Sequence, residues 1–140
     1  MQGLFLEDLS VGQSAELTRA VGAADIEAFA AVTGDNNPVH LDAAFAATTN
    51  FGERIAHGML SAGYISAVIG TTLPGPGAIY LSQTLRFKRP VKIGDAVTAR
   101  ATITEIDAAK ARVTLATVCL VNEKPVVEGE AVIMVPRRDA

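Results

Sequence analysis

The spacing of apolar and polar residues changes near the middle of the chain, and this change predicts where helices give way to strands. From Ala23 to Val32, apolar residues recur every three or four positions, which predicts an amphipathic helix that ends at Gly34. From Gly58 to Leu73, apolar or small side chains occupy every face. A helix over this second range must therefore be surrounded by protein.

Beyond the second helix the repeat of the pattern falls to two. The segment from Leu73 to Gly77 is rich in proline and glycine and cannot continue a helix. Alternation of apolar and polar side chains then predicts four strands, over residues 79–88, 97–104, 113–121 and 126–135. The first of these is expected to be half-exposed, and residues 14–21 offer one more strand.

These elements together predict an α+β fold. Consecutive strands with short turns favour an antiparallel sheet, and the apolar helix needs an element that encloses it. A strongly curved sheet wrapped around the helix meets both demands, which is the hot-dog architecture, although periodicity alone also allows a generic α+β sandwich. At 140 residues the chain fits one domain, residues 1–140, that is large enough to fold without disulfides or metals.

Composition bears on partners and location. Hydrophobic residues make up 49% of the chain and charged residues 19%, which favours a buried subunit interface, such as that of a homodimer. A formal net charge of -3 gives no extended basic surface, so nucleic acid is not an expected partner. The single cysteine, Cys119, fits a reducing, cytoplasmic compartment. The longest apolar run is shorter than the roughly 20 residues that cross a membrane, and Glu7 and Asp8 do not fit a signal peptide.

The segment from Thr33 to His40 carries the residues best suited to chemistry. Pro38 disfavours a helix here, and in a bent loop Asp35 and His40 can converge on one water molecule. The alternative is that Asp35 caps a turn, Asn37 bonds to the local backbone and His40 is a half-buried structural histidine. Composition alone does not separate these interpretations.

The order of residues in this segment resembles a known family. Gly34-Asp35-x-Asn37-Pro38-x-His40, followed by the small residues of 43–47, is similar to the signature of the MaoC-like (R)-specific enoyl-CoA hydratases. Residues 53–60 resemble that family's entry into its central helix, and residues 73–91 resemble the loop and strand after it. The similarity extends over about residues 4–136 and fits best the short, single-domain bacterial members linked to polyhydroxyalkanoate synthesis.

The resemblance implies an enzyme that hydrates a trans-2-enoyl-CoA to the (R)-3-hydroxyacyl-CoA by syn addition, with no metal and no cofactor beyond the CoA of its substrate. Asp35 is expected to take a proton from water, His40 to fix that water and share the proton transfer, and Asn37 to orient them. How acid and base roles divide between Asp35 and His40 stays open. The backbone N–H of Gly58 is expected to stabilise charge on the thioester oxygen. Apart from the resemblance, His57 is expected to position the start of the helix, and a catalytic role is the alternative.

Substrate contacts outside the reacting atoms are expected in two places. The acyl chain is predicted to run along the central helix past Ala62, Ser66 and Ile69, which three- and four-residue spacing places on one face. The CoA phosphates are predicted to lie near a basic cluster: Arg86, Lys88 and Arg89. The alternatives are ordinary core packing for the first set and a solvated strand edge for the second.

Two other functions compete with hydration. Hot-dog proteins also include acyl-CoA thioesterases, which direct water at the thioester carbon, but the Asp-x-Asn-Pro-x-His order is not expected there. A non-catalytic subunit that binds an acyl carrier or acts as a scaffold is the second alternative, and the presence of both Asp35 and His40 argues against it. For a hydratase, the pathway is either the supply of polyhydroxyalkanoate monomers or fatty-acid metabolism.

Overall fold

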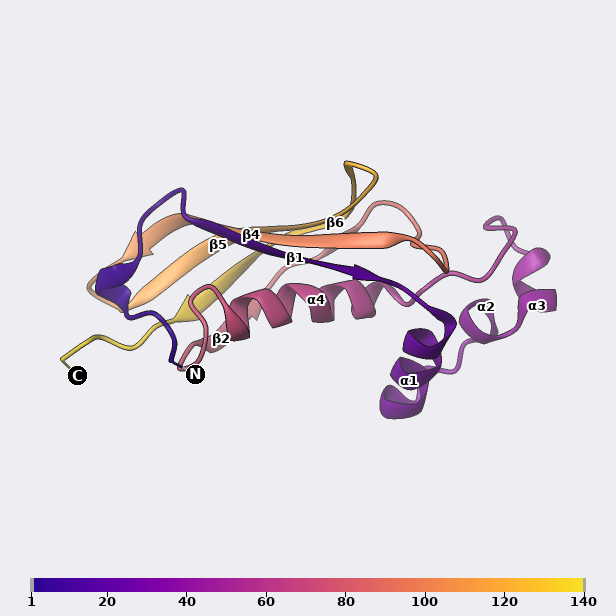
Figure 1. The fold of residues 1–140 in the computed structure, drawn as a ribbon, viewed down its shortest axis with the longest axis horizontal. Helices are drawn as coiled ribbons and strands as arrows, with labels where there is room; N and C mark the ends of the chain where they lie inside the picture. Colours follow the sequence, from indigo (N-terminus) through magenta and orange to yellow (C-terminus); the bar gives the residue numbers. More distant parts are fainter. Residues whose placement is uncertain (1, 140) are drawn as a thin grey trace.

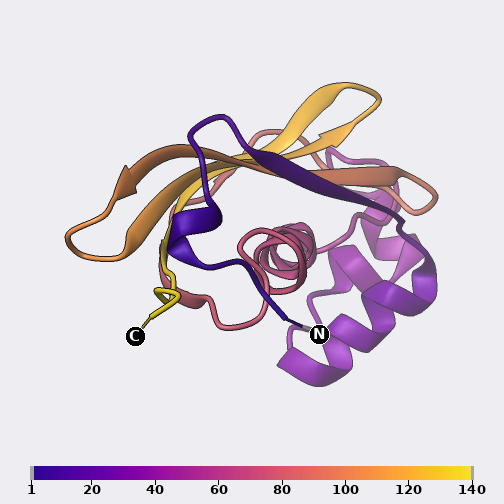
Figure 2. The ribbon, with the colours of Figure 1, turned by 60° about the vertical axis from the view of Figure 1, so that its left-hand side comes forward.

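The computed structural model describes residues 2–139 and shows a curved antiparallel sheet with one long helix along its concave side (Figures 1 and 2). The neighbouring strands are, in order, β1 (Ser14–Ala20), β4 (Ala96–Asp107), β5 (Arg112–Val121), β6 (Lys124–Met134) and β2 (Ile79–Gln83). A short strand, β3 (Arg86–Phe87), also pairs with β6, and a single 3-10 turn (Leu6–Asp8) precedes β1. The predicted α+β hot-dog fold is confirmed.

Alternation along the central strands explains the concave, apolar face of the sheet. In β4, every second residue from Val97 to Ile103 is at most 1% exposed, whereas Thr98, Arg100 and Thr102 between them are only partly buried. The same alternation runs through β5, whose turn into β6 places Asn122 and Glu123 at positive φ, as a tight hairpin requires. The three longest strands thus form a continuous apolar face against which the helix packs.

The long helix, α4 (Gly58–Thr71), packs against the apolar face of the sheet with only one of its own faces. Ile65 and Ile69 are at most 1% exposed against the sheet, whereas Met59 and Ser66 lie exposed on the opposite side. The expectation that protein surrounds this helix is therefore not met within residues 2–139. None of the described helices is long and apolar enough to cross a membrane.

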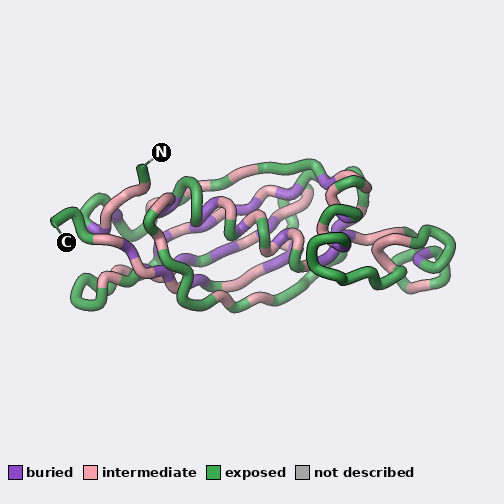
Figure 3. Tube along the Cα trace, turned by 90° about the horizontal axis from the view of Figure 1, so that it is seen from below, coloured by how far each residue is buried: buried purple, intermediate pink, exposed green. Residues whose placement is uncertain are grey.

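Three short helices form a segment that projects beyond the N-terminal end of α4 (Figure 1, right). They are α1 (Ala23–Thr33), α2 (Pro38–Leu41) and α3 (Ala43–Ala47). Gly34 ends α1 in the left-handed conformation, with φ 82°, as predicted. Exposed residues predominate here, in contrast to the middle of the body (Figure 3).

The helix α2 corrects the expectation that Pro38 prevents helix formation. Proline occupies the first helical position, where its missing N–H has no intrahelical acceptor in any case. Asn37 precedes it as the cap, and its side-chain oxygen accepts from the Val39 N–H at 3.1 Å. His40 is therefore carried by a capped turn of helix rather than by an irregular loop.

The strand expected over residues 79–88 is also different from the prediction. It is divided into β2 and β3, with a register shift between Tyr80 and Ser82, and neither piece has the expected half-buried alternation. Ile79, Leu81 and Phe87 are all exposed. The reason is position, because β2 lies at an edge of the sheet and nothing within residues 2–139 covers its outward side.

Candidate active site

Asp35, His40 and His57 converge where the projecting segment meets the start of α4. One carboxylate oxygen of Asp35 and one ring nitrogen from each histidine lie within 4.8 Å of one another. The two hydrogen bonds of a water diverge at roughly the tetrahedral angle, so bonds of about 2.8–3.0 Å bridge atoms about 4.6–4.9 Å apart. The predicted pair, Asp35 and His40, is thus close enough to hold one water between its members.

Asp35 lies between α1 and α2, with its side chain exposed. Its carboxylate accepts from the backbone N–H of Asn37 at 3.4 Å. The side-chain oxygen of Asn37 accepts from the Val39 N–H in the cap of α2, so this atom is not free to orient a water or the pair as expected. Asn37 instead acts on the pair through its backbone and through the helix that carries His40.

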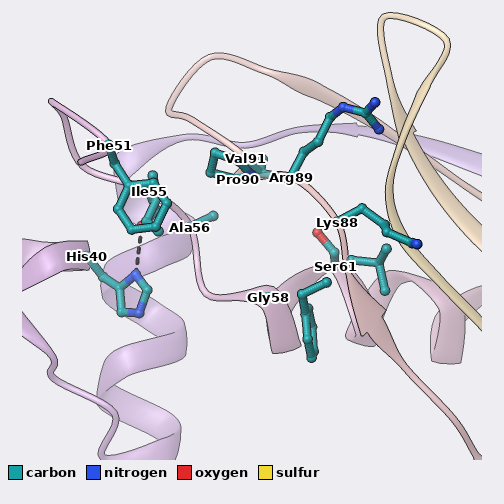
Figure 4. Close-up of a pocket in the computed structure, with 12 residues that line it drawn as sticks. His40, Phe51, Ile55, Ala56, Gly58, Ser61, Lys88, Arg89, Pro90 and Val91 are labelled. Carbon is teal, nitrogen blue, oxygen red and sulfur yellow. Dashed lines mark hydrogen bonds between the residues drawn. The ribbon is translucent and has the colours of Figure 1, made fainter. Parts of the chain in front are cut away.

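The ring of His40 is oriented from the segment that leads into α4. Its Nδ1 lies 2.8 Å from the carbonyl oxygen of Ile55, shown as the dashed line in Figure 4. A carbonyl only accepts, so Nδ1 carries the hydrogen and the Nε2 of the neutral ring is left as an acceptor. The Nε of Arg54 donates to the backbone oxygen of His40 at 2.7 Å. Sequence reasoning did not identify Arg54 or Ile55 as supports for His40.

The same three side chains raise the question of a metal ion. The rings of His40 and His57 are stacked, with centroids 3.8 Å apart and planes at 29°. An imidazole lone pair lies in the plane of its ring, so two stacked rings do not direct their lone pairs at one ion. The donor set fits a held water and proton transfer better than a metal centre.

A pocket of about 280 Å³ opens beside His40 (Figure 4). Gly58 and Ser61, both from the first turn of α4, form one part of its lining. Phe51 and Phe87 add aromatic surface from the two segments that flank the helix. The pocket therefore joins an imidazole acceptor to a mostly apolar hollow, as a site for an acyl group requires.

Gly58 stands at the point where the helix enters the pocket. As the first residue of α4 it has no intrahelical acceptor for its N–H, and this group donates to no other atom among residues 2–139. A Cβ at this position would lie 2.5 Å from the ring of Phe87. Glycine is thus the residue that lets the aromatic ring and a substrate approach the free N–H together.

The predicted acyl-contact residues do not form one wall. Ser66 is exposed, Ala62 is half-buried and Ile69 is fully buried under the sheet. None of the three lines the pocket, where Ser61 takes the place expected of Ser66. Three- and four-residue spacing placed them on one side of the helix, but it did not show how the helix is rotated against the sheet.

The predicted basic cluster is divided between two surfaces. Lys88 and Arg89 line the pocket, whereas Arg86 lies along a separate groove that Lys88 also borders on the outer side of the sheet. The guanidinium of Arg89 donates to the backbone oxygen of Pro125 at 2.6 Å. Lys88 forms no ion pair with any residue in the range 2–139, so its ammonium is the freer cation at the pocket rim.

Cys119 lies directly behind the pocket wall. Its thiol donates to the backbone oxygen of Ser61 at 3.4 Å, and burial raises the pKa of Cys119 to about 12. The thiol is therefore protonated at neutral pH and sealed from the pocket. This cysteine supports the wall and is not a nucleophile.

Comparison with known proteins identifies the family of this chain. Residues 8–124 match the family model for the MaoC like domain. The chain is 54% identical to the (R)-specific enoyl-CoA hydratase of Rhodospirillum rubrum, covering 96% of this chain and 93% of that protein. Among solved structures, an unliganded R-hydratase from Pseudomonas aeruginosa superimposes with a TM-score of 0.92 at 55% identity, over 97% of this chain and 88% of that one.

A second solved structure is similar along its whole length. The (R)-hydratase of Aeromonas caviae involved in PHA biosynthesis has a TM-score of 0.90 at 48% identity, over 93% of this chain and 99% of that one. Family model, sequence identity and fold all indicate the same family. The chain belongs to the MaoC-like domain family.

Proposed function

We propose that this protein is an (R)-specific enoyl-CoA hydratase, which adds water to a trans-2-enoyl-CoA to give the (R)-3-hydroxyacyl-CoA. The observation that carries the proposal is the approach of Asp35 and His40 beside a mostly apolar pocket. The similarity to (R)-specific hydratases over nearly the whole chain supports it. By analogy with the Aeromonas caviae protein, which is involved in PHA biosynthesis, the product enters polyhydroxyalkanoate synthesis, with fatty-acid metabolism as the alternative.

The two side chains hold the water in a reactive orientation. The Asp35 carboxylate is an acceptor, and His40 has its free acceptor at Nε2 because Nδ1 donates to Ile55. A water that donates one hydrogen to each has both O–H bonds engaged and a lone pair left over. That lone pair is the nucleophile, and the pocket beside His40 is where the β-carbon of the enoyl group is placed.

Proton and charge balance follow from the same arrangement. As the water oxygen bonds to the β-carbon, one of its protons passes to the Asp35–His40 pair and the double-bond electrons move towards the thioester oxygen. The free N–H of Gly58 stabilises the negative charge on that oxygen, with the dipole of α4 behind it. The pair then gives a proton to the α-carbon, so that one water is consumed and the pair returns to its starting state.

Carrier recognition is assigned to the rim of the pocket. The substrate of this proposal carries the phosphates of CoA, and Lys88 is a rim cation with no ion-pair partner among residues 2–139. Replacing it by glutamine removes a charge that attracts those phosphates and leaves the reacting groups intact. Lys88→Gln is therefore expected to raise KM for the CoA substrate and to leave kcat close to the wild-type value.

Crotonyl-CoA separates hydration from thioester hydrolysis. A hydratase removes the absorbance of the conjugated double bond without releasing free thiol, and a stereospecific dehydrogenase then identifies the (R) product. A thioesterase releases free thiol and leaves the double bond intact. Free thiol as the main product would reject the hydratase proposal, and absence of both changes would favour a non-catalytic binding role.

We also propose that the functional unit is a homodimer. The outward face of α4 exposes Met59, and the edge strand β2 exposes Ile79 and Leu81. These apolar side chains lie on one strand edge and one helix, and a second copy of the chain covers both at once. The 49% share of hydrophobic residues supports the same assembly.

Light scattering on two matched variants tests the dimer. Leu81→Lys places a charge on the exposed edge of β2, whereas Val11→Lys places the same charge on an exposed turn before β1. The first variant is expected to be monomeric or to associate only at high concentration, and the second is expected to stay dimeric. A wild-type protein that is a fully active monomer at working concentration would contradict the proposal.

A further inference from the structure

His57 is a buried residue that contacts both Asp35 and His40. It is 2% exposed and lies directly before Gly58 at the N-terminus of α4. Its Nε2 is 2.9 Å from the backbone oxygen of Asp35, and its ring is stacked on that of His40. The His57 side chain therefore contacts both members of the catalytic pair. The residue itself is joined by a peptide bond to Gly58, the proposed oxyanion donor.

The hydrogen bond fixes which nitrogen of His57 carries the hydrogen. A backbone carbonyl only accepts, so Nε2 donates to Asp35 and the Nδ1 of the neutral ring has no hydrogen. Nδ1 is buried and has no hydrogen-bond partner among residues 2–139. A second hydrogen there would bury an unpaired donor and a positive charge, which is unfavourable. The contacts of His57 thus favour the Nε2–H tautomer.

This state is unsuited to proton transfer with the substrate. Its donor is occupied by Asp35, its other nitrogen is enclosed, and the residue does not line the pocket. The two contacts instead restrain position. The hydrogen bond fixes the backbone that carries the Asp35 carboxylate, and the stacked ring limits rotation of the His40 imidazole.

We infer that His57 is a positioning residue that keeps the Asp35 carboxylate, the His40 ring and the Gly58 N–H in register with one another. The inference rests on the proposed hydratase function and adds to it a residue that acts through others. It explains how two segments 22 positions apart, one at Asp35 and one at the start of α4, form a single site. A loss of register of about 1 Å lowers turnover by up to about 100-fold.

Two substitutions separate the contacts of His57. His57→Gln keeps an N–H at the ε position and removes the ring, whereas His57→Phe keeps the ring and removes the donor. Each is expected to lower kcat on crotonyl-CoA by about tenfold or more and to leave KM within about threefold, because geometry is lost and not substrate contact. The matched control is Phe29→Leu, since the ring of Phe29 contacts His57 from α1, with centroids 4.6 Å apart.

The kinetic result overturns the inference in either of two ways. Wild-type kcat in both His57 variants would show that the residue serves only the fold, particularly if their melting temperatures fall. An equal loss of kcat in Phe29→Leu would show that general packing around the ring, and not the contacts with Asp35 and His40, is responsible. Circular dichroism at the assay temperature confirms that each variant is folded when it is measured.

A spectroscopic test on the wild-type protein does not depend on activity. The chain has two histidines, so ¹⁵N NMR of tag-free protein resolves both rings, and the His57 variants assign them. The structure predicts opposite tautomers, with the hydrogen on Nδ1 in His40 and on Nε2 in His57. A hydrogen on Nδ1 of His57 would overturn the inference. If crotonyl-CoA is not hydrated at all, the proposed function fails, and the tautomers still decide whether His57 makes these contacts.

Discussion

The body, formed by α4 and the sheet, and the projecting segment that carries Asp35 and His40 are stabilised in different ways. In the body, α4 and the sheet bury side chains such as Ile65, Leu115 and Ile133 to 1% exposure or less. In the segment from Gly34 to Ala56, most residues are exposed, and hydrogen bonds from caps and from the residues before α4 fix the backbone. Because the reacting groups lie outside the core, changes to them and changes to the core should have separable effects on activity and stability.

The largest expected effect is the loss of activity on removing either member of the catalytic pair. Asp35→Asn and His40→Gln should each lower kcat by about 100-fold to 10,000-fold, as expected for groups that transfer protons. The melting temperature should change little, because Asp35 is exposed and His40 is half-buried. Asp42→Asn is the matched control, since this carboxylate in the same segment only caps α3 through the Phe45 N–H. Near-normal rates in both pair variants would remove support for the mechanism.

A core substitution should give the opposite result. Leu115 is fully buried in the middle of β5, and Leu115→Ala should lower the free energy of unfolding by about 2–5 kcal/mol through lost burial and the cavity left behind. Urea unfolding followed by circular dichroism measures this change. The activity per folded molecule should stay close to wild type. A large fall in kcat without a loss of stability would show that the body takes a direct part in the chemistry.

Gly58 lies at the boundary between the two regions, and its substitution should reduce activity without loss of stability. Alanine is the better helix former, but its Cβ would lie 2.5 Å from the Phe87 ring, which must then move within the pocket that it lines. Gly58→Ala should therefore lower kcat/KM by about tenfold or more. The double variant Gly58→Ala/Phe87→Leu should recover part of the loss. No recovery would place the cause at the N–H and not at the ring.

The smallest expected effect concerns the cap of α2. Asn37→Ala removes the acceptor for the Val39 N–H and should cost about 1 kcal/mol of local helix stability. Because α2 carries His40, kcat should fall modestly, by about tenfold or less. Asn37→Asp keeps an oxygen at the capping position and should stay near wild type. Equal losses in the alanine and aspartate variants would show that the amide, and not the cap, is required.

The sequence predicted the elements that bury one face against another element of the same chain. The helix that becomes α1, the apolar helix α4 and the three central strands followed from periodicity, because each buries a regular face against another element. The strand expected over residues 79–88 did not, since half-burial requires a cover that residues 2–139 do not provide. The helix at Pro38 was missed because proline was judged as a helix breaker and not as a first helical residue.

The candidate site was predictable in its reacting residues but not in their supports. The residue order around Asp35 and His40 indicated the pair, since such motifs are local in sequence. Arg54 and Ile55 hold His40 through contacts between segments, and a sequence pattern does not record which backbone atoms will meet. Likewise, Ser61 rather than Ser66 lines the pocket because of how α4 is rotated against the sheet.

A double-mutant cycle tests most directly whether Asp35 and His40 act together on one water. The measurement is kcat/KM on crotonyl-CoA for the wild type, Asp35→Asn, His40→Gln and the double variant. If both groups hold the same water, losing either removes most of the catalysis, and the double variant should be about as slow as the slower single variant. Losses that multiply in the double variant would show that the two side chains act independently and would contradict the shared water.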